Sequence, residues 1–152
     1  SSLRKKIKKI TKNNAGYSPI FREIYANPKI RKEILAHELG HGMNRKSVGT
    51  VPLLAGIYMT KAAPLVSISS GIAGEKYGPA IAALAHIPTL VDEGFASKRA
   101  IQLLRDAGVP EKDIPKAKKR LMKAWLTYLT LPATTWGVGT IARVLTDLVS
   151  GR

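Results

Sequence analysis

The chain contains no cysteine. A disulfide framework, a thiolate metal site and a cysteine nucleophile are therefore excluded, and a metal ion could be held only by His, Asp or Glu. Aromatic residues make up only 6% of the 152 residues, and few of them lie among the lysines, which argues against base stacking on nucleic acid. Sustained alternation of polar and apolar residues, the pattern of a half-buried strand, is also missing. We therefore expect an all-α fold.

Long uninterrupted apolar runs are scarce as well. The middle of the chain is apolar, but charged residues cut it into pieces of 13 to 14 residues, each too short to cross a bilayer. The longest uncharged stretch, residues 124–142, carries five Thr, two Gly and one Pro, which makes it a weak transmembrane candidate. The beginning, SSLRKKIKKITKNN, lacks the apolar core of a secretory signal. We expect a cytoplasmic or membrane-associated protein.

Acidic residues are few, because 10 Asp and Glu stand against 25 Lys and Arg, for a formal net charge of +15. Residues 1–46 carry +9, residues 47–97 carry −1 and residues 98–152 carry +7. Two basic flanks around an almost uncharged middle predict attraction to nucleic acid or to anionic lipid headgroups. The candidate phosphate contacts are RKKIKK (4–9) and KAKKRLMK (116–123). We divide the chain into a basic N-terminal segment, residues 1–26, and a helical domain, residues 27–152.

Proline and glycine indicate where the helices begin and end. A capping side chain precedes a proline at Ser18-Pro19 and at Asn27-Pro28, which predicts a helix start at each position. Between residues 49 and 79, frequent glycines and prolines predict short helical pieces and turns. The longer helices that these signals predict are 28–43, 88–107 and 115–131, and Pro132 interrupts the third before a last apolar segment to about residue 149.

One motif carries chemistry. The predicted helix 28–43 contains His37-Glu38-Leu39-Gly40-His41, an HExxH sequence that uses two of the three histidines. Residues four apart share one face of a helix, so both imidazoles can reach a single ion at about 2.0–2.1 Å. Glu38 is rotated away from that face and can act on a metal-bound water instead. The spacing therefore predicts a zinc ion (Zn²⁺) held by His37 and His41, with Glu38 as the general base.

Gly40 inside this helix costs about 1 kcal/mol relative to alanine, and close packing around a metal would explain why it is there. A catalytic zinc ion also needs a third protein ligand and an open position for water. Glu93 is favoured, because an unpaired carboxylate in the apolar-flanked segment LVDEGFASKRA would be expensive to bury. Asp92 is adjacent and equally acidic, so the residues alone separate the two acids poorly. His86 is the remaining candidate near them, although a core histidine explains it better.

The segments ILAHELGHGMN, LVDEGFASKRAIQLL and KRLMKAWLTYLT follow one another over about residues 30–131. Together they resemble the bacterial neutral zinc metallopeptidases, which are described as membrane proteases. That family pairs an HExxH helix with a later helix carrying Glu-x-x-Ala-Ser-x-Arg-Ala, which this chain matches at Glu93, Ala96, Ser97, Arg99 and Ala100.

The resemblance implies a single compact, zincin-like helical domain. In it the HExxH helix packs against the helix that supplies Glu93 as the third zinc ligand. Ser97 stands where the wider group of membrane metalloproteases has an acid, and it could support a histidine as a neutral hydrogen-bond partner. The short stretch between the motifs and the basic N-terminal segment depart from the family pattern, as a specialised, phage-associated member would.

We therefore expect a zinc-dependent metallopeptidase that acts on a protein or peptide substrate. Glu38 would accept a proton from water and return it to the leaving amine, while His86, Tyr77 or Tyr128 could donate a hydrogen bond to the oxyanion. Two alternatives stay open. One is a non-catalytic, basic structural or nucleic-acid-binding protein that retains the metallopeptidase fold. The other is a protein that binds an anionic membrane surface through its lysines.

Overall fold

The computed structural model describes residues 15–18, 23–26 and 30–152. Contacts between residues divide the chain into two compact units, which we call unit 1 (Ser1–Thr50 and Asp92–Trp125) and unit 2 (Val51–Val91 and Leu126–Arg152). The single domain expected over residues 27–152 stays a prediction. The basic run at residues 4–9 lies outside the described residues.

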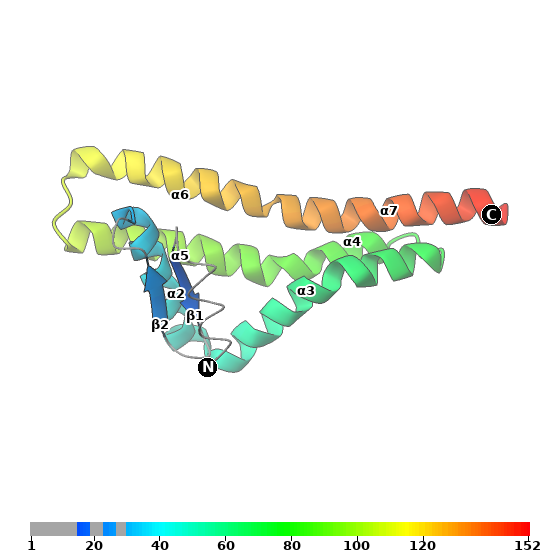
Figure 1. Cartoon of the computed structure of the whole chain (residues 1–152), viewed down its shortest axis with the longest axis horizontal. Helices are drawn as coiled ribbons and strands as arrows, with labels where there is room; N and C mark the ends of the chain where they lie inside the picture. The colour runs from blue at the N-terminus through cyan, green and yellow to red at the C-terminus, as the bar shows by residue number, and fades with distance from the viewer. Residues whose placement is uncertain (1–14, 19–22, 27–29) are drawn as a thin grey trace. The chain divides into compact units, whose positions relative to one another are not determined.

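Helices make up most of the described chain, so the prediction of a mainly helical fold is confirmed. They are α2 (Lys32–Val48), α3 (Thr50–Ile72), α4 (Gly78–Ala83), α5 (Ile87–Asp106), α6 (Ile114–Tyr128) and α7 (Thr130–Ser150), with the 3-10 turns η1 (Leu84–His86) and η2 (Glu111–Asp113) (Figure 1).

One hairpin departs from the all-α prediction. Strands β1 (Ala15–Ser18) and β2 (Glu23–Ala26) pair antiparallel, with Tyr17 opposite Ile24, and they lie against α2 (Figure 1). The helix start predicted at Ser18-Pro19 is therefore wrong. A residue before proline is pushed towards extended backbone, which suits the end of a strand as well as it suits a helix cap. Two four-residue strands are also too short to show a sustained alternation.

Two further helix predictions need correction. The helix with the HExxH motif begins at Lys32, four residues after Pro28, because Arg31 is still extended at φ −67° and ψ 141°. Of the region 49–79, residues 50–72 form one helix, α3, of 23 residues that continues through Pro64, whereas the turns predicted there are found at Gly49 and around Gly74. Gly71 in this helix serves packing rather than a turn, since a Cβ there would lie 3.1 Å from the backbone nitrogen of Arg143 and closer still to the carbonyl oxygen of Gly139. The predicted helices 88–107 and 115–131 are confirmed as α5 and α6, with ends shifted by one to three residues.

Unit 1 has a small apolar core between α2, α5 and α6. Its buried members are Ala36, Ala100, Ile101, Leu104, Ile114, Ala117 and Leu121. Alanine at three of these positions lets the helices approach closely, and a Cβ on Gly40 would lie only 2.5 Å from the carbonyl oxygen of Ala96 on α5. The expectation that the HExxH helix packs against the helix carrying Glu93 is confirmed. Gly40 is explained by this helix contact, not by packing around a metal.

Unit 2 is held together by small and polar buried residues of α3, α4, η1 and α7. The Ser67 hydroxyl donates to the carbonyl of Thr135, and His86 Nε2 lies 2.6 Å from the Thr135 hydroxyl. Gly139 lies directly against Ser67 and Pro79, and α4 lies beside α7 (Figure 1). Among the residues that the structure describes, no helix has both the length and the apolar character to cross a membrane. The stretch 124–142 is divided between α6 and α7.

Candidate metal centre

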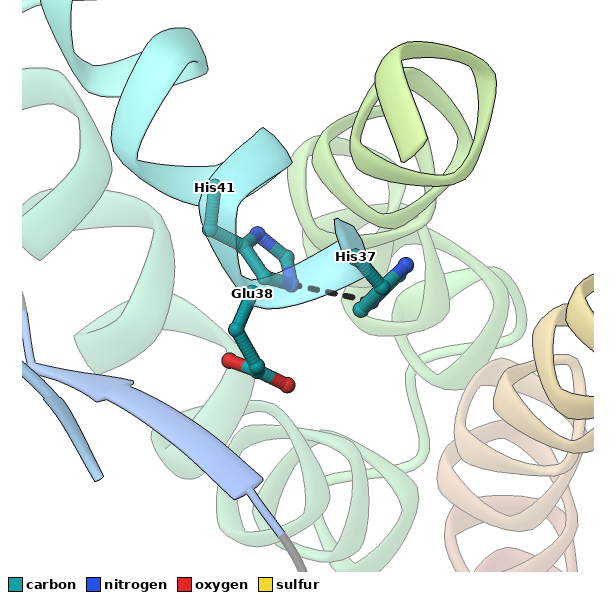
Figure 2. A group of neighbouring side chains, drawn as sticks. All are labelled: His37, Glu38 and His41. Carbon is teal, nitrogen blue, oxygen red and sulfur yellow. Dashed lines mark hydrogen bonds between the residues drawn. The ribbon is translucent and has the colours of Figure 1, made fainter. Parts of the chain in front are cut away.

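Two imidazoles meet on one face of α2. His37 and His41 lie one turn apart, with their Nε2 atoms 3.1 Å from each other and their rings almost perpendicular at 88° (Figure 2). The carboxylate of Glu38 completes a group whose ligand atoms all lie within 4.8 Å of one another. Both Nε2 atoms can therefore bind one small cation, with the Glu38 carboxylate beside them.

Helix α5 adds a carboxylate to this pair. Glu93 Oε2 lies 2.8 Å from His37 Nε2 and 3.5 Å from His41 Nε2. Ligand atoms around a tetrahedral zinc ion, each bonded at about 2.0–2.2 Å, are roughly 3.2–3.6 Å apart. The triangle of 2.8, 3.1 and 3.5 Å is slightly smaller than that, so a modest outward movement would accommodate one ion. These two nitrogens and one oxygen are a donor set that zinc accepts.

Asp92 approaches the other edge of the second imidazole. Its Oδ2 lies 2.9 Å from His41 Nδ1, on the opposite side of the ring from the Nε2 atom that faces Glu93. Consecutive residues on a helix point about 100° apart, because 3.6 residues complete a turn. Of the two acids that the residues alone did not separate, only Glu93 is shown within 3.5 Å of both Nε2 atoms.

Polar side chains surround the group. The Ser97 hydroxyl lies 3.1 Å from His37 Nδ1, the neutral support that the sequence predicts. Asn44 Nδ2 donates to Asp92 Oδ1 at 2.8 Å and to the Asp92 carbonyl at 2.9 Å, and Arg99 Nε donates to Asn44 Oδ1 at 2.8 Å. Asn44 is not among the residues that the sequence predicts for the site, although Asn44 follows His41 by three residues and so shares its helix face.

The charges in the group reinforce one another. Burial would lower the pKa of His41, but its hydrogen bonds to the carboxylates of Asp92 and Glu93 outweigh burial and raise the pKa to about 10. Burial would raise the pKa of Glu93, but hydrogen bonds with His37 and His41 lower it to about 2. At neutral pH His41 is therefore an imidazolium held between two carboxylates. A metal ion that takes this place must displace the proton of His41.

Glu38 lies in a different environment from Glu93. Burial raises its pKa above the usual value, Glu93 adds to the rise, and the two imidazoles oppose it. The backbone N–H of Tyr17 in β1 donates to the Glu38 carboxylate, which ties the hairpin to α2. A carboxylate whose pKa moves towards neutrality is suited to take up a proton and to release it again.

The other side chains considered for chemistry belong to unit 2. His86 is 1% exposed, and burial lowers its pKa, as expected of a core histidine. Its Nε2 is hydrogen-bonded to the Thr135 hydroxyl, while its Nδ1 has no hydrogen-bond partner among the residues that the structure describes. Tyr77 is largely exposed. The role of His86, Tyr77 or Tyr128 as an oxyanion donor stays a prediction.

The basic run at residues 116–123 lies within α6, with Ala117 and Leu121 of the run buried in the core of unit 1. Lys116, Lys118, Lys119 and Lys123 are exposed, whereas Arg120 Nη1 donates to Glu33 Oε1 on α2 at 2.6 Å. Arg120 thus forms an ion pair within unit 1. Contact of the basic run with nucleic acid or lipid stays a prediction.

Comparisons of the chain with protein-family models, curated proteins and solved structures find no match. The proposal of a function below therefore rests on the residues, their geometry and the resemblance of three sequence segments.

Proposed function

We propose that the protein is a zinc-dependent, zincin-like metallopeptidase related to the bacterial neutral zinc metallopeptidases. The observation that supports this most is the triangle of 2.8, 3.1 and 3.5 Å formed by Glu93 Oε2 and the Nε2 atoms of His37 and His41. The separate, half-buried carboxylate of Glu38 stands beside the triangle. Three ligands and one adjacent acid are the parts that a hydrolytic zinc site needs.

The residues divide the work of peptide hydrolysis among them. His37, His41 and Glu93 would hold the ion, which when bound lowers the pKa of a water molecule and polarises the scissile carbonyl. Glu38 would accept the proton that water gives up and pass it to the leaving amine. Its raised pKa favours that exchange, and the N–H of Tyr17 holds the carboxylate in place.

The substitution Glu38→Gln tests this assignment. It removes the base and keeps the three ligands, so zinc content should stay near one per chain while cleavage of a denatured protein falls at least about 100-fold. Glu75→Gln, an exposed acid in unit 2, is the matched control and should change neither quantity. Undiminished cleavage by the Glu38 variant would remove the general base from the mechanism, and wild-type protein without zinc would remove the metal centre.

We also propose that unit 2 attaches the protein to an anionic membrane surface. Of the 25 large apolar side chains exposed in the described part of the chain, 20 belong to unit 2. Lys61, Lys76 and Arg152 are exposed in the same unit and could meet anionic headgroups. Apolar side chains together with cations favour the lipid interface over a purely electrostatic contact with nucleic acid.

Flotation with vesicles tests this second proposal. Binding to vesicles that contain phosphatidylserine should survive moderate salt, because part of the attraction is apolar. Binding to duplex DNA, measured over the same salt series, should be weaker and fall steeply as salt rises. The proposal would be wrong if the protein stayed with the unbound fraction at low salt.

A further inference from the structure

We propose that the second imidazole of the metal centre is aimed by a chain of positioning residues, namely Asp92, Asn44 and Arg99. The imidazole is that of His41, and the inference rests on the proposed metal centre. The chain alternates between helices, because His41 and Asn44 lie on α2 while Asp92 and Arg99 lie on α5. All four residues belong to unit 1.

The first link determines which nitrogen of His41 faces the metal. Asp92 Oδ2 lies 2.9 Å from Nδ1, so Nδ1–H donates to a carboxylate and the ring cannot turn without losing that bond. Nε2 is then the nitrogen directed at His37 Nε2 and Glu93 Oε2. A carboxylate on the far nitrogen of a metal-binding histidine fixes its tautomer and raises its basicity as a ligand.

The second link keeps the Asp92 carboxylate in place. The amide of Asn44 donates from one nitrogen to Oδ1 and to the main-chain oxygen of Asp92, at 2.8 and 2.9 Å. Asn44 is only 4% exposed, so water competes little for these bonds. Because one oxygen of Asp92 accepts from Asn44 and the other from His41, the carboxylate has little freedom to swing towards the Nε2 atoms.

The third link gives the amide its direction. Arg99 Nε donates to Asn44 Oδ1 at 2.8 Å. A rotated Asn44 amide would place its NH₂ group against the guanidinium and its oxygen against the Asp92 carboxylate, and both contacts would be unfavourable. Arg99 therefore selects the orientation in which Asn44 donates to Asp92, and the hydrogen bonds from Asn44 and from His41 converge on the Asp92 carboxylate.

The two imidazoles are thus supported unequally. His37 Nδ1 has the Ser97 hydroxyl at 3.1 Å, a neutral group, where His41 Nδ1 has a carboxylate backed by an amide and a guanidinium. A neutral hydroxyl fixes a ring less firmly than a charge-assisted hydrogen bond does. We expect loss of the His41 support to weaken metal binding more than loss of the His37 support.

Zinc affinity measured by competition with a chelator tests the inference without reference to activity. Asp92→Asn should keep one zinc per chain but weaken its affinity about 10–100-fold, and Arg99→Met should weaken it less. Ser97→Ala should have the smallest effect of the three. Asp106→Asn, an exposed acid on the same helix, is the matched control and should leave the affinity unchanged. Circular dichroism shows whether each variant keeps its helices.

A second readout reports the geometry itself. In the zinc-loaded wild type, ¹⁵N NMR of the histidine rings should show His41 protonated at Nδ1 and coordinated through Nε2. In Arg99→Met that Nδ1–H signal should broaden or shift, because the carboxylate is less firmly held. Unchanged affinity and an unchanged His41 signal in both variants would overturn the positioning role.

Glu93→Gln separates this inference from the proposed function. If it loses zinc while Asp92→Asn keeps wild-type affinity, the metal centre stands and the positioning chain is wrong. If Asp92→Asn loses zinc and Glu93→Gln retains it, Asp92 is a ligand and the chain is again wrong. Absence of zinc from the wild type would remove both proposals.

Discussion

Units 1 and 2 bury different kinds of side chain. Unit 1 has an apolar core of seven buried residues, and beside it ionisable groups gather in half-buried pairs. In unit 2 the most deeply buried positions include the polar residues Ser67, His86 and Thr135. Most of the exposed large apolar side chains of the described chain also belong to unit 2. We infer that unit 1 holds the metal centre and that the surface of unit 2 contacts a less polar environment, as a membrane surface would be.

Substitutions at tightly packed glycines test this difference between the units, and Gly40→Ala should affect both the stability of unit 1 and its metal centre. The new Cβ would lie 2.5 Å from the carbonyl of Ala96, so α2 and α5 must move apart. We expect a loss of about 1–3 kcal/mol in the free energy of unfolding, measured in urea, together with weaker zinc binding.

Gly137→Ala is the control for that change. It lies inside α7, and a Cβ there would meet nothing within 4 Å. Alanine should therefore stabilise the helix by up to about 1 kcal/mol and leave zinc binding alone. Equal effects of the two substitutions would contradict the close helix contact at Gly40.

Gly139→Ala should disturb unit 2 by the same mechanism. Its Cβ would lie 2.6 Å from the Ser67 carbonyl and 2.8 Å from Pro79 Cβ, so we expect a loss of about 1–3 kcal/mol in unfolding free energy. Zinc affinity should stay at the wild-type value, because the proposed ligands all belong to unit 1. A parallel loss of zinc would show that the two units do not divide the functions as we infer.

The stability of the metal-free protein should depend on pH through the ion pairs of unit 1. The pKa of His41 rises from 6.5 to about 10, so its contribution is complete below pH 6.5 and is lost as pH rises towards 10. The pKa of Glu93 falls from 4.5 to about 2, so its contribution is complete above pH 4.5 and is lost as pH falls towards 2. Thermal unfolding should show a maximum between about pH 4.5 and 6.5.

Bound zinc should extend the stability of the protein to higher pH. Because the ion displaces the His41 proton, its affinity should increase as pH rises from 6.5 towards 10. The loaded protein should then keep its stability at alkaline pH, where the metal-free form loses it. An affinity that does not change with pH would mean that His41 carries no proton to displace.

The smallest effects on stability are expected on the surface of unit 2. Leu148 and Val149 are 76% and 90% exposed, so changing both to Ser should alter the unfolding free energy by no more than about 0.5 kcal/mol per site. Binding to anionic vesicles should nevertheless decrease. Met122→Ser, at an exposed apolar position of unit 1, should leave vesicle binding unchanged. Equal losses from both units would remove the special role of unit 2.

The sequence predicted those parts of the site that depend on local spacing. His37, Glu38 and His41 are brought together by one turn of helix, so their grouping needs no knowledge of the rest of the fold. The end of α5 just before Gly108 and Pro110 was also predictable, because Gly108 has φ 80°, a conformation that suits glycine.

Features that depend on partners distant in the sequence could not be read in this way. The continuous helix α3 was missed because its glycines resemble turn residues until their packing partners are known. The different places of Asp92 and Glu93 depend on how far α5 is rotated about its axis against α2. The contact of Gly40 with Ala96 and the hydrogen bonds of Asp92 and Glu93 to the histidines show that rotation.

X-ray absorption at the zinc edge of the purified protein tests the central claim most directly. The account predicts one zinc ion per chain, bound by two imidazole nitrogens and a carboxylate oxygen at about 2.0–2.2 Å, with the carboxylate contribution lost in Glu93→Gln. Protein that takes up no stoichiometric zinc, or a spectrum with fewer than two imidazoles, would contradict it.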